Sequence, residues 1–142
     1  MPSPNLILDI PAWCKWDPSP AIYFNISIHP GDEVSLAVSG EGTSGMAIIE
    51  NHTTCETVGE LLTSSNEICK SGVNWAVELW GDGNSTNSFA DFGTITFSNA
   101  VASTPNGKSG PSNATGYSFG EGKNLTTVWT TDTEVAVQFI GN

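Results

Sequence analysis

The chain has 142 residues, the size of one domain that can bury a single hydrophobic core, and we expect a single domain over residues 1–142. Fifteen acidic and four basic residues give a formal net charge of -11, which would repel nucleic acids and anionic membranes, so we expect neither as a partner. The sequence contains no run of the roughly 18 apolar residues that a membrane-spanning helix needs.

Short runs of alternating or β-branched residues follow one another along the chain, separated by clusters of Gly, Asn, Asp and Pro. This arrangement is typical of an all-β, antiparallel β-sandwich, and no helix is expected. The polar segment 53–71 is expected to be a long connection. The expected strands are residues 21–28, 33–39, 45–50, 73–80, 92–99, 125–131 and 134–140.

The strand expected at 73–80 carries large side chains on both faces. Its odd-numbered residues, Trp75 among them, alternate with even-numbered residues that include Glu78 and Trp80. One face would belong to the core and the other would line a partly covered groove. Between Ala76 and Trp80 the Glu78 carboxyl would lose hydration, which favours proton transfer.

Cysteines and glycosylation sequons bear on the compartment. A bridge between Cys55 and Cys69 is the most local pairing and would leave Cys14 free, and three reduced thiols in a cytosolic protein are the alternative. The start, "MPSPNLILDIPAW", lacks the features of a signal peptide, so the protein is either secreted after its leader is removed or cytoplasmic. Secretion is favoured by the number of Asn-x-Ser/Thr sequons, which begin at Asn25, Asn51, Asn84, Asn113 and Asn124.

Most active-site motifs are absent from the sequence. It has no phosphate-binding Gly-Lys loop, no Gly-x-Ser-x-Gly elbow and no metal-ligand spacing, and His29 and His52 lie in or beside expected turns. We therefore expect no metal and no cofactor. Carboxylate chemistry is what remains.

Several segments resemble a known family. "ISIHPGDEV" (26–34), "IIENHTT" (48–54), "ICKSGVNWAVELW" (68–80) and "FADFGTITFSNAVA" (89–102) follow, in order, the second half of the eqolisins, the fungal glutamic peptidases. "AWCKWDP" (12–18) resembles the aromatic segment that precedes them. The resemblance implies a secreted, concanavalin-like β-sandwich that lacks the family's N-terminal strands, and acid-active peptide hydrolysis by a Glu/Gln pair.

The resemblance assigns roles to single positions. Glu78 stands where the family has its catalytic glutamate, but the catalytic glutamine belongs to an N-terminal segment, and the one glutamine here is Gln138. Lys15 replaces an acid of the family and Asp17 an aromatic residue, so both are candidate assistants of Glu78. Lys15 would either pair with Glu78 or donate a hydrogen bond in place of the glutamine. The alternatives for Glu78 are a solvated rim position or a pair with Lys70.

Other positions follow from the same comparison. Trp13 and Trp16 are retained from the family and, with Trp80 and Asn74, are the expected substrate-binding residues, although tryptophans in a sandwich are more often plain packing. Cys69 matches a family cysteine whose partner lies in the N-terminal segment, and Cys55 stands where the family tends to have glycine.

Three functions are compatible with these observations. The first is a repurposed enzyme that uses Glu78 as general acid/base in a cyclisation, isomerisation or elimination of a small molecule. The second is the heavy chain of an acid glutamic peptidase that receives its glutamine from another chain. The third is a non-catalytic module that binds a peptide or glycan. Open sheet edges would be covered by a second copy of the chain, a light chain or residues 5–11.

Overall fold

The computed structural model describes residues 9–78, 90–118 and 125–141. The chain divides into two compact units, Met1–Lys70 and Ser71–Asn142, which we describe separately. Whether they form the single domain expected for residues 1–142 stays a prediction. Among the described residues, no helix is long and apolar enough to cross a membrane.

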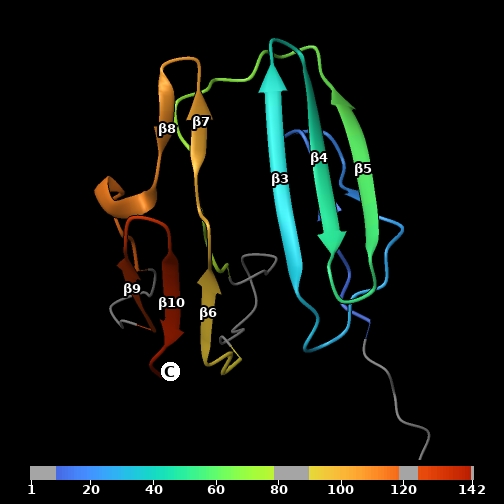
Figure 1. The fold of residues 1–142 in the computed structure, drawn as a ribbon. Helices are drawn as coiled ribbons and strands as arrows, with labels where there is room; N and C mark the ends of the chain where they lie inside the picture. The colour runs from blue at the N-terminus through green and yellow to red at the C-terminus, as the bar shows by residue number, and fades with distance from the viewer. Residues whose placement is uncertain (1–8, 79–89, 119–124, 142) are drawn as a thin grey trace, which may run out of the picture. The chain divides into compact units, whose positions relative to one another are not determined.

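The first unit contains a three-stranded antiparallel sheet (Figure 1). Its strands follow the order of the chain and are joined by tight turns: β3 (Val34–Glu41), β4 (Ser44–Asn51) and β5 (Glu56–Thr63). Two short strands before it, β1 (Trp13–Cys14) and β2 (Ile22–Tyr23), pair antiparallel with each other.

The core of the first unit lies under one face of β4. Side chains alternate along the strand, so Ala47, Ile49 and Asn51 share a face, and all three are buried. The ring of Trp16 covers the start of this face at Gly45, where a Cβ would lie 3.2 Å from Cζ3 of the indole. Glycine at this position therefore lets the aromatic segment lie directly on the sheet.

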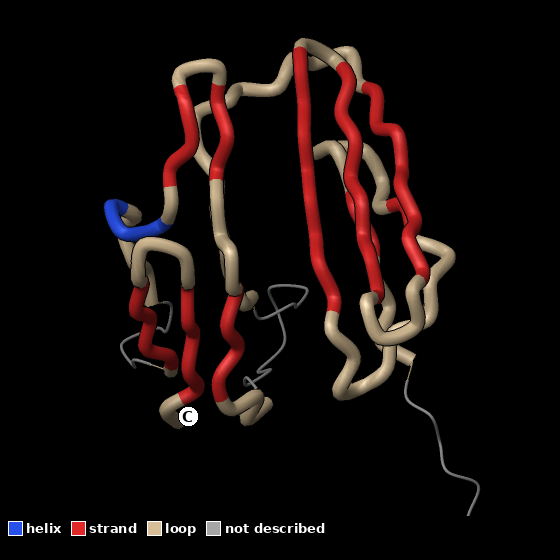
Figure 2. Tube along the Cα trace, in the orientation of Figure 1, coloured by secondary structure: helices blue, strands red, loops and turns tan. Residues whose placement is uncertain are grey.

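The second unit contains a three-stranded antiparallel sheet in the order β6-β10-β9, and its strands are drawn in red in Figure 2. The strands are β6 (Thr94–Phe97), β9 (Thr126–Thr130) and β10 (Val135–Phe139). A hairpin of β7 (Ala102–Thr104) and β8 (Gly107–Ser109) and a 3-10 turn, η1 (Pro111–Asn113), lie between β6 and β9 in sequence.

The core of the second unit consists of buried Ala100, Val135 and Val137. Five partly buried apolar side chains pack against these three residues, namely Trp75, Val77, Phe92, Phe97 and Val128. Residues 73–78 thus supply part of this core through Trp75 and Val77.

The expected all-β, antiparallel architecture is confirmed, and the strands predicted at 33–39, 45–50, 125–131 and 134–140 correspond to β3, β4, β9 and β10. The strand predicted at 92–99 is shorter, as β6, and only Ile22–Tyr23 of the strand predicted at 21–28 is a strand. A three-residue 3-10 turn is present where no helix was expected.

Two predictions about the middle of the chain are wrong. The expected connection 53–71 contains β5, in which Glu56, Gly59 and Glu60 obscure the apolar alternation although pairing with β4 completes the sheet. Residues 73–78 of the strand expected at 73–80 are in no strand, and residues 79–80 lie outside the described residues. Alternation alone does not make a strand, because a strand also needs a neighbour for its backbone hydrogen bonds.

Candidate functional site

Glu78 lies at the end of a segment anchored from beneath. Trp75 and Val77 are partly buried and pack on the core cluster of the second unit, whereas Ala76 and Glu78 are exposed. The side chains therefore alternate as the sequence predicts, even without a hydrogen-bonded ladder. Ala76, one expected wall of the groove at Glu78, is exposed. Trp80, the other expected wall, lies outside the described residues, so the groove stays a prediction.

Gln138 lies on the wrong face of the sheet to act with Glu78. Within β10 it follows Val137, which points into the core, so the exposed Gln138 side chain points to the opposite face. The segment that carries Glu78 packs on the Val137 face. The sheet thus separates the only glutamine of the sequence from the candidate catalytic carboxyl.

Both lysines proposed as partners of Glu78 pair with other carboxylates. Nζ of Lys15 lies 2.9 Å from Oδ1 of Asp17, and the two side chains are 37% and 79% exposed. Nζ of Lys70 lies 2.5 Å from Oε2 of Glu41, again at the surface. Exposed pairs of this kind contribute at most about 1 kcal/mol. Lys15 and Asp17 are thus brought together by their spacing of two residues, and their role as assistants of Glu78 stays a prediction.

The expected binding residues have different surroundings. Trp16 is partly buried and packs on Gly45, whereas Trp13 of β1 is 39% exposed. Asn74 is exposed in the segment before Glu78. The candidates therefore fall into two groups, one in the segment 13–17 of the first unit and one in the segment 74–78 of the second.

The expected bridge between Cys55 and Cys69 is not formed. Both are exposed free thiols, and Cys14 is a free, half-buried thiol. Cys55 precedes β5 and Cys69 follows it, so the eight residues of this strand lie between them. Such a strand is about 26 Å long, whereas a disulfide needs Cα atoms less than about 7 Å apart.

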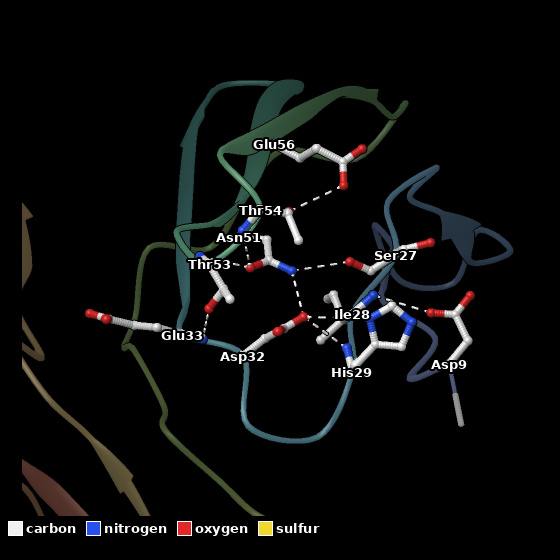
Figure 3. Close-up of polar contacts among 10 residues, drawn as sticks. All are labelled: Asp9, Ser27, Ile28, His29, Asp32, Glu33, Asn51, Thr53, Thr54 and Glu56. Carbon is white, nitrogen blue, oxygen red and sulfur yellow. Dashed lines mark hydrogen bonds and ion pairs between the residues drawn. The ribbon is translucent and has the colours of Figure 1, made fainter. Parts of the chain in front are cut away.

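Asn51, at the end of β4, organises a polar cluster that the sequence analysis did not predict (Figure 3). Its side chain is fully buried, and Nδ2 donates hydrogen bonds to Oδ2 of Asp32 at 2.8 Å and to the Ser27 carbonyl at 3.1 Å. Oδ1 accepts hydrogen bonds from the backbone N–H groups of Thr53 and Thr54. These contacts tie the turn at Asp32 to the next hairpin.

The environment of Asp32 is electrostatically favourable for its ionised form. The backbone N–H of His29 and the amide of Asn51 donate to its carboxylate and together lower the pKa of Asp32. The sequence signal for this cluster was the pair of family-like segments "ISIHPGDEV" and "IIENHTT", which supply its residues. The likeness of these two segments to the family therefore has a structural explanation.

A shallow pocket of about 290 Å³ lies beside β9, lined by Gly116–Ser118, Thr126–Val128 and Ile140. None of the predicted site residues that the structure describes lines this pocket. Within the described part of the chain, no cluster of His, Cys, Asp and Glu side chains is suited to hold a metal ion.

Comparison with known proteins agrees with the all-β fold. Residues 8–139 match the model of the Peptidase A4 family. Aspergillopepsin-2 from Aspergillus niger is 38% identical over 108 residues, which are 73% of this chain and 38% of that protein. The chain thus spans well under half the length of this curated relative.

Two solved structures are similar in fold. The crystal structure of aspergilloglutamic peptidase from Aspergillus niger has a TM-score of 0.82 at 32% identity, covering 92% of this chain and 79% of that one. The structure of scytalido-glutamic peptidase with a peptide-based transition-state analogue has a TM-score of 0.74 at 22% identity, covering 92% and 69%. Both agree with the expected eqolisin-type β-sandwich. Because the family match extends over residues 8–139 of 142, the chain belongs to the Peptidase A4 family, the eqolisin glutamic peptidases.

Proposed function

We propose that this chain carries the general acid/base, Glu78, of an acid-active glutamic peptidase, and that the amide donor for the scissile carbonyl comes from a polypeptide segment outside these 142 residues. The observation that supports this most directly is the position of Glu78. Its side chain is exposed, while Trp75 and Val77 hold the backbone from below. An extended peptide can reach such a carboxyl without entering a closed pocket.

The proposed reaction uses Glu78 twice. Its carboxylate takes a proton from a water molecule as the water oxygen attacks the peptide carbonyl. The carboxyl group then gives that proton to the amide nitrogen as the C–N bond breaks, so the products are a carboxylic acid and an amine. A separate hydrogen-bond donor must stabilise the oxyanion, and Gln138 lies on the wrong face to do so.

A complementary chain that supplies this donor would also explain an uncovered strand. β3 is an edge strand, and its Leu36 and Val38 are 68% and 80% exposed. Both share the face on which Ile49 of β4 is buried, because they lie opposite Ile49 and Ala47 in the ladder. Exposed apolar side chains beside an open edge are suited to a further polypeptide segment.

The second candidate is a repurposed enzyme in which Glu78 moves protons on a small molecule. It is favoured by the position of Gln138, since a cyclisation, isomerisation or elimination needs no amide of this kind. The exposure of Glu78 favours the peptidase over this second candidate, because a protein normally encloses most of the surface of a small substrate. We also infer that the protein is secreted. The number of sequons supports this, and so does the net charge of -11, whose self-repulsion is removed by protonation in an acidic environment.

The test is digestion of an acid-denatured protein at a pH below about 4, where carboxyl groups are partly protonated. The purified chain, Glu78→Gln and Glu67→Gln are compared, because Glu67 is another exposed glutamate and its change alters the charge equally. Without the amide donor we expect cleavage about 10²- to 10³-fold slower than by aspergillopepsin-2. Glu67→Gln should keep this activity and Glu78→Gln should lose it.

Two results would contradict the peptidase proposal. Cleavage by Glu78→Gln at the wild-type rate would remove Glu78 from the mechanism. Complete absence of cleavage, with no gain when polypeptides of the protein's natural source are added, would favour the second candidate.

A further inference from the structure

The described residues contain three Asn-x-Ser/Thr sequons in different surroundings, at Asn25, Asn51 and Asn113. Attachment of a glycan to a folded chain requires that the Asn amide project into solvent and that one of its two N–H hydrogens be replaceable. The exposure and the hydrogen bonds of each Asn side chain therefore indicate whether the folded protein can carry a glycan on that Asn.

Asn113 meets both conditions. It is the exposed last residue of η1, and Thr115, the third residue of its sequon, is also exposed. The turn is held in place by buried Pro111, whose carbonyl accepts a hydrogen bond of 2.9 Å from the N–H of Ala114. From Ala114 the chain continues in an extended conformation. A glycan on Asn113 would thus extend from a fixed surface turn without displacing a packed side chain.

Asn25 meets the same conditions on the first unit. It is exposed at a bend two residues after β2. The residues around it are anchored, since the N–H of Phe24 donates to the Ala12 carbonyl at 3.0 Å and Ile28 is buried. The bend therefore presents the Asn25 side chain to solvent while its flanks stay fixed.

Asn51 differs from the other two. Its side chain has no exposed surface, and both hydrogens of Nδ2 have acceptors, the Asp32 carboxylate and the Ser27 carbonyl. Figure 3 shows the Asn51 amide between Ser27 and Asp32, with dashed lines to both. A sugar on Nδ2 would have to replace one of these hydrogen bonds and occupy space that the chain already fills. A chain modified at Asn51 could not form this cluster.

From these contrasts we propose that Asn25 and Asn113 are N-glycosylation sites of the chain when it passes through the secretory pathway, and that Asn51 stays unmodified in the folded protein. The donor is a lipid-linked diphosphate oligosaccharide. The Asn side-chain nitrogen forms a bond to the anomeric carbon, the bond from that carbon to the diphosphate oxygen breaks, and the amide loses one proton. The lipid diphosphate is the leaving group.

The experiment is secretion of the whole chain from yeast behind a heterologous leader, followed by peptide mapping. Enzymatic release of N-glycans in ¹⁸O-labelled water converts each glycosylated Asn into a labelled Asp. We expect label at Asn25 and Asn113 and none at Asn51. Ser27→Ala and Thr115→Ala should each lower the mass of the intact secreted protein by one glycan, because each destroys one sequon and leaves the Asn in place.

Two outcomes would overturn the proposal: secreted protein without label at Asn25 and Asn113, or secreted protein with label at Asn51. Ser27→Ala is the suitable variant for the first unit, since it keeps the backbone carbonyl that Asn51 uses. The readout does not involve Glu78, so it stands or falls independently of the proposed catalysis.

Discussion

Replacing Asn51 by alanine is expected to destabilise the first unit by about 3 kcal/mol at neutral pH. The change removes four hydrogen bonds of a fully buried side chain, each with a net contribution of about 0.5–1.5 kcal/mol. Part of this loss is recovered, because Thr53 and Thr54 are exposed and water can replace the lost partner of their N–H groups. The assay is urea unfolding followed by tryptophan fluorescence, to which Trp13 and Trp16 of the first unit contribute.

The pH dependence of this effect has a defined sign. Hydrogen bonds from the His29 N–H and from Asn51 lower the pKa of Asp32 in the folded state. Such a carboxylate stabilises the fold above the unfolded pKa of about 4, and this contribution is lost as the pH falls through the folded pKa. Asn51→Ala removes one of the two hydrogen bonds, so the difference in stability between wild type and variant should narrow in acid.

The control is Asn66→Ala, the same chemical change at an exposed loop position, for which we expect a change within about 0.5 kcal/mol. A loss below about 1 kcal/mol for Asn51→Ala at neutral pH would refute the reasoning from buried hydrogen bonds. A difference that widens as the pH falls would refute the assignment of the charged partner.

Two further predictions concern other parts of the chain. Gly110→Ala should destabilise the second unit by about 1–3 kcal/mol, because a Cβ would lie 1.8 Å from the carbonyl oxygen of Asp132. The control in thermal unfolding is Gly72→Ala, whose Cβ would meet nothing within 4 Å and which should leave the transition temperature almost unchanged. Equal transition temperatures for the two variants would contradict the close approach at Gly110. Burial, and secondarily the charge of Glu60, raise the pKa of the Cys14 thiol. Cys14 should therefore react with iodoacetamide at mildly alkaline pH more slowly than the two exposed thiols, and its reaction should be faster in Glu60→Gln than in the wild type. The rates are measured by peptide mass spectrometry, and equal rates for all three thiols would disprove the prediction.

Much of the strand pattern could be predicted from the sequence. β3 and β10 carry apolar residues at every second position, which is the period of a strand. β4 and β9 are short runs rich in apolar and β-branched residues, which are also typical of strands. The same reasoning placed Trp75 and Val77 inward and Glu78 outward, and the structure confirms this alternation. β5 could not be found in this way, because its glutamates and glycine are tolerated only through the pairing with β4.

What the sequence by itself determined is the class of the protein: period-two alternation and glycine-rich turns specify an antiparallel β fold, and a set of motifs specifies the Peptidase A4 family. Only the tertiary structure decided which groups meet. Lys15 pairs with Asp17, Gln138 faces away from the side on which Glu78 lies, and the length of β5 keeps Cys55 from Cys69. The physical reason is that alternation is a local property of the backbone, whereas partners depend on strand register and on which face each strand presents, and residues distant in sequence set both.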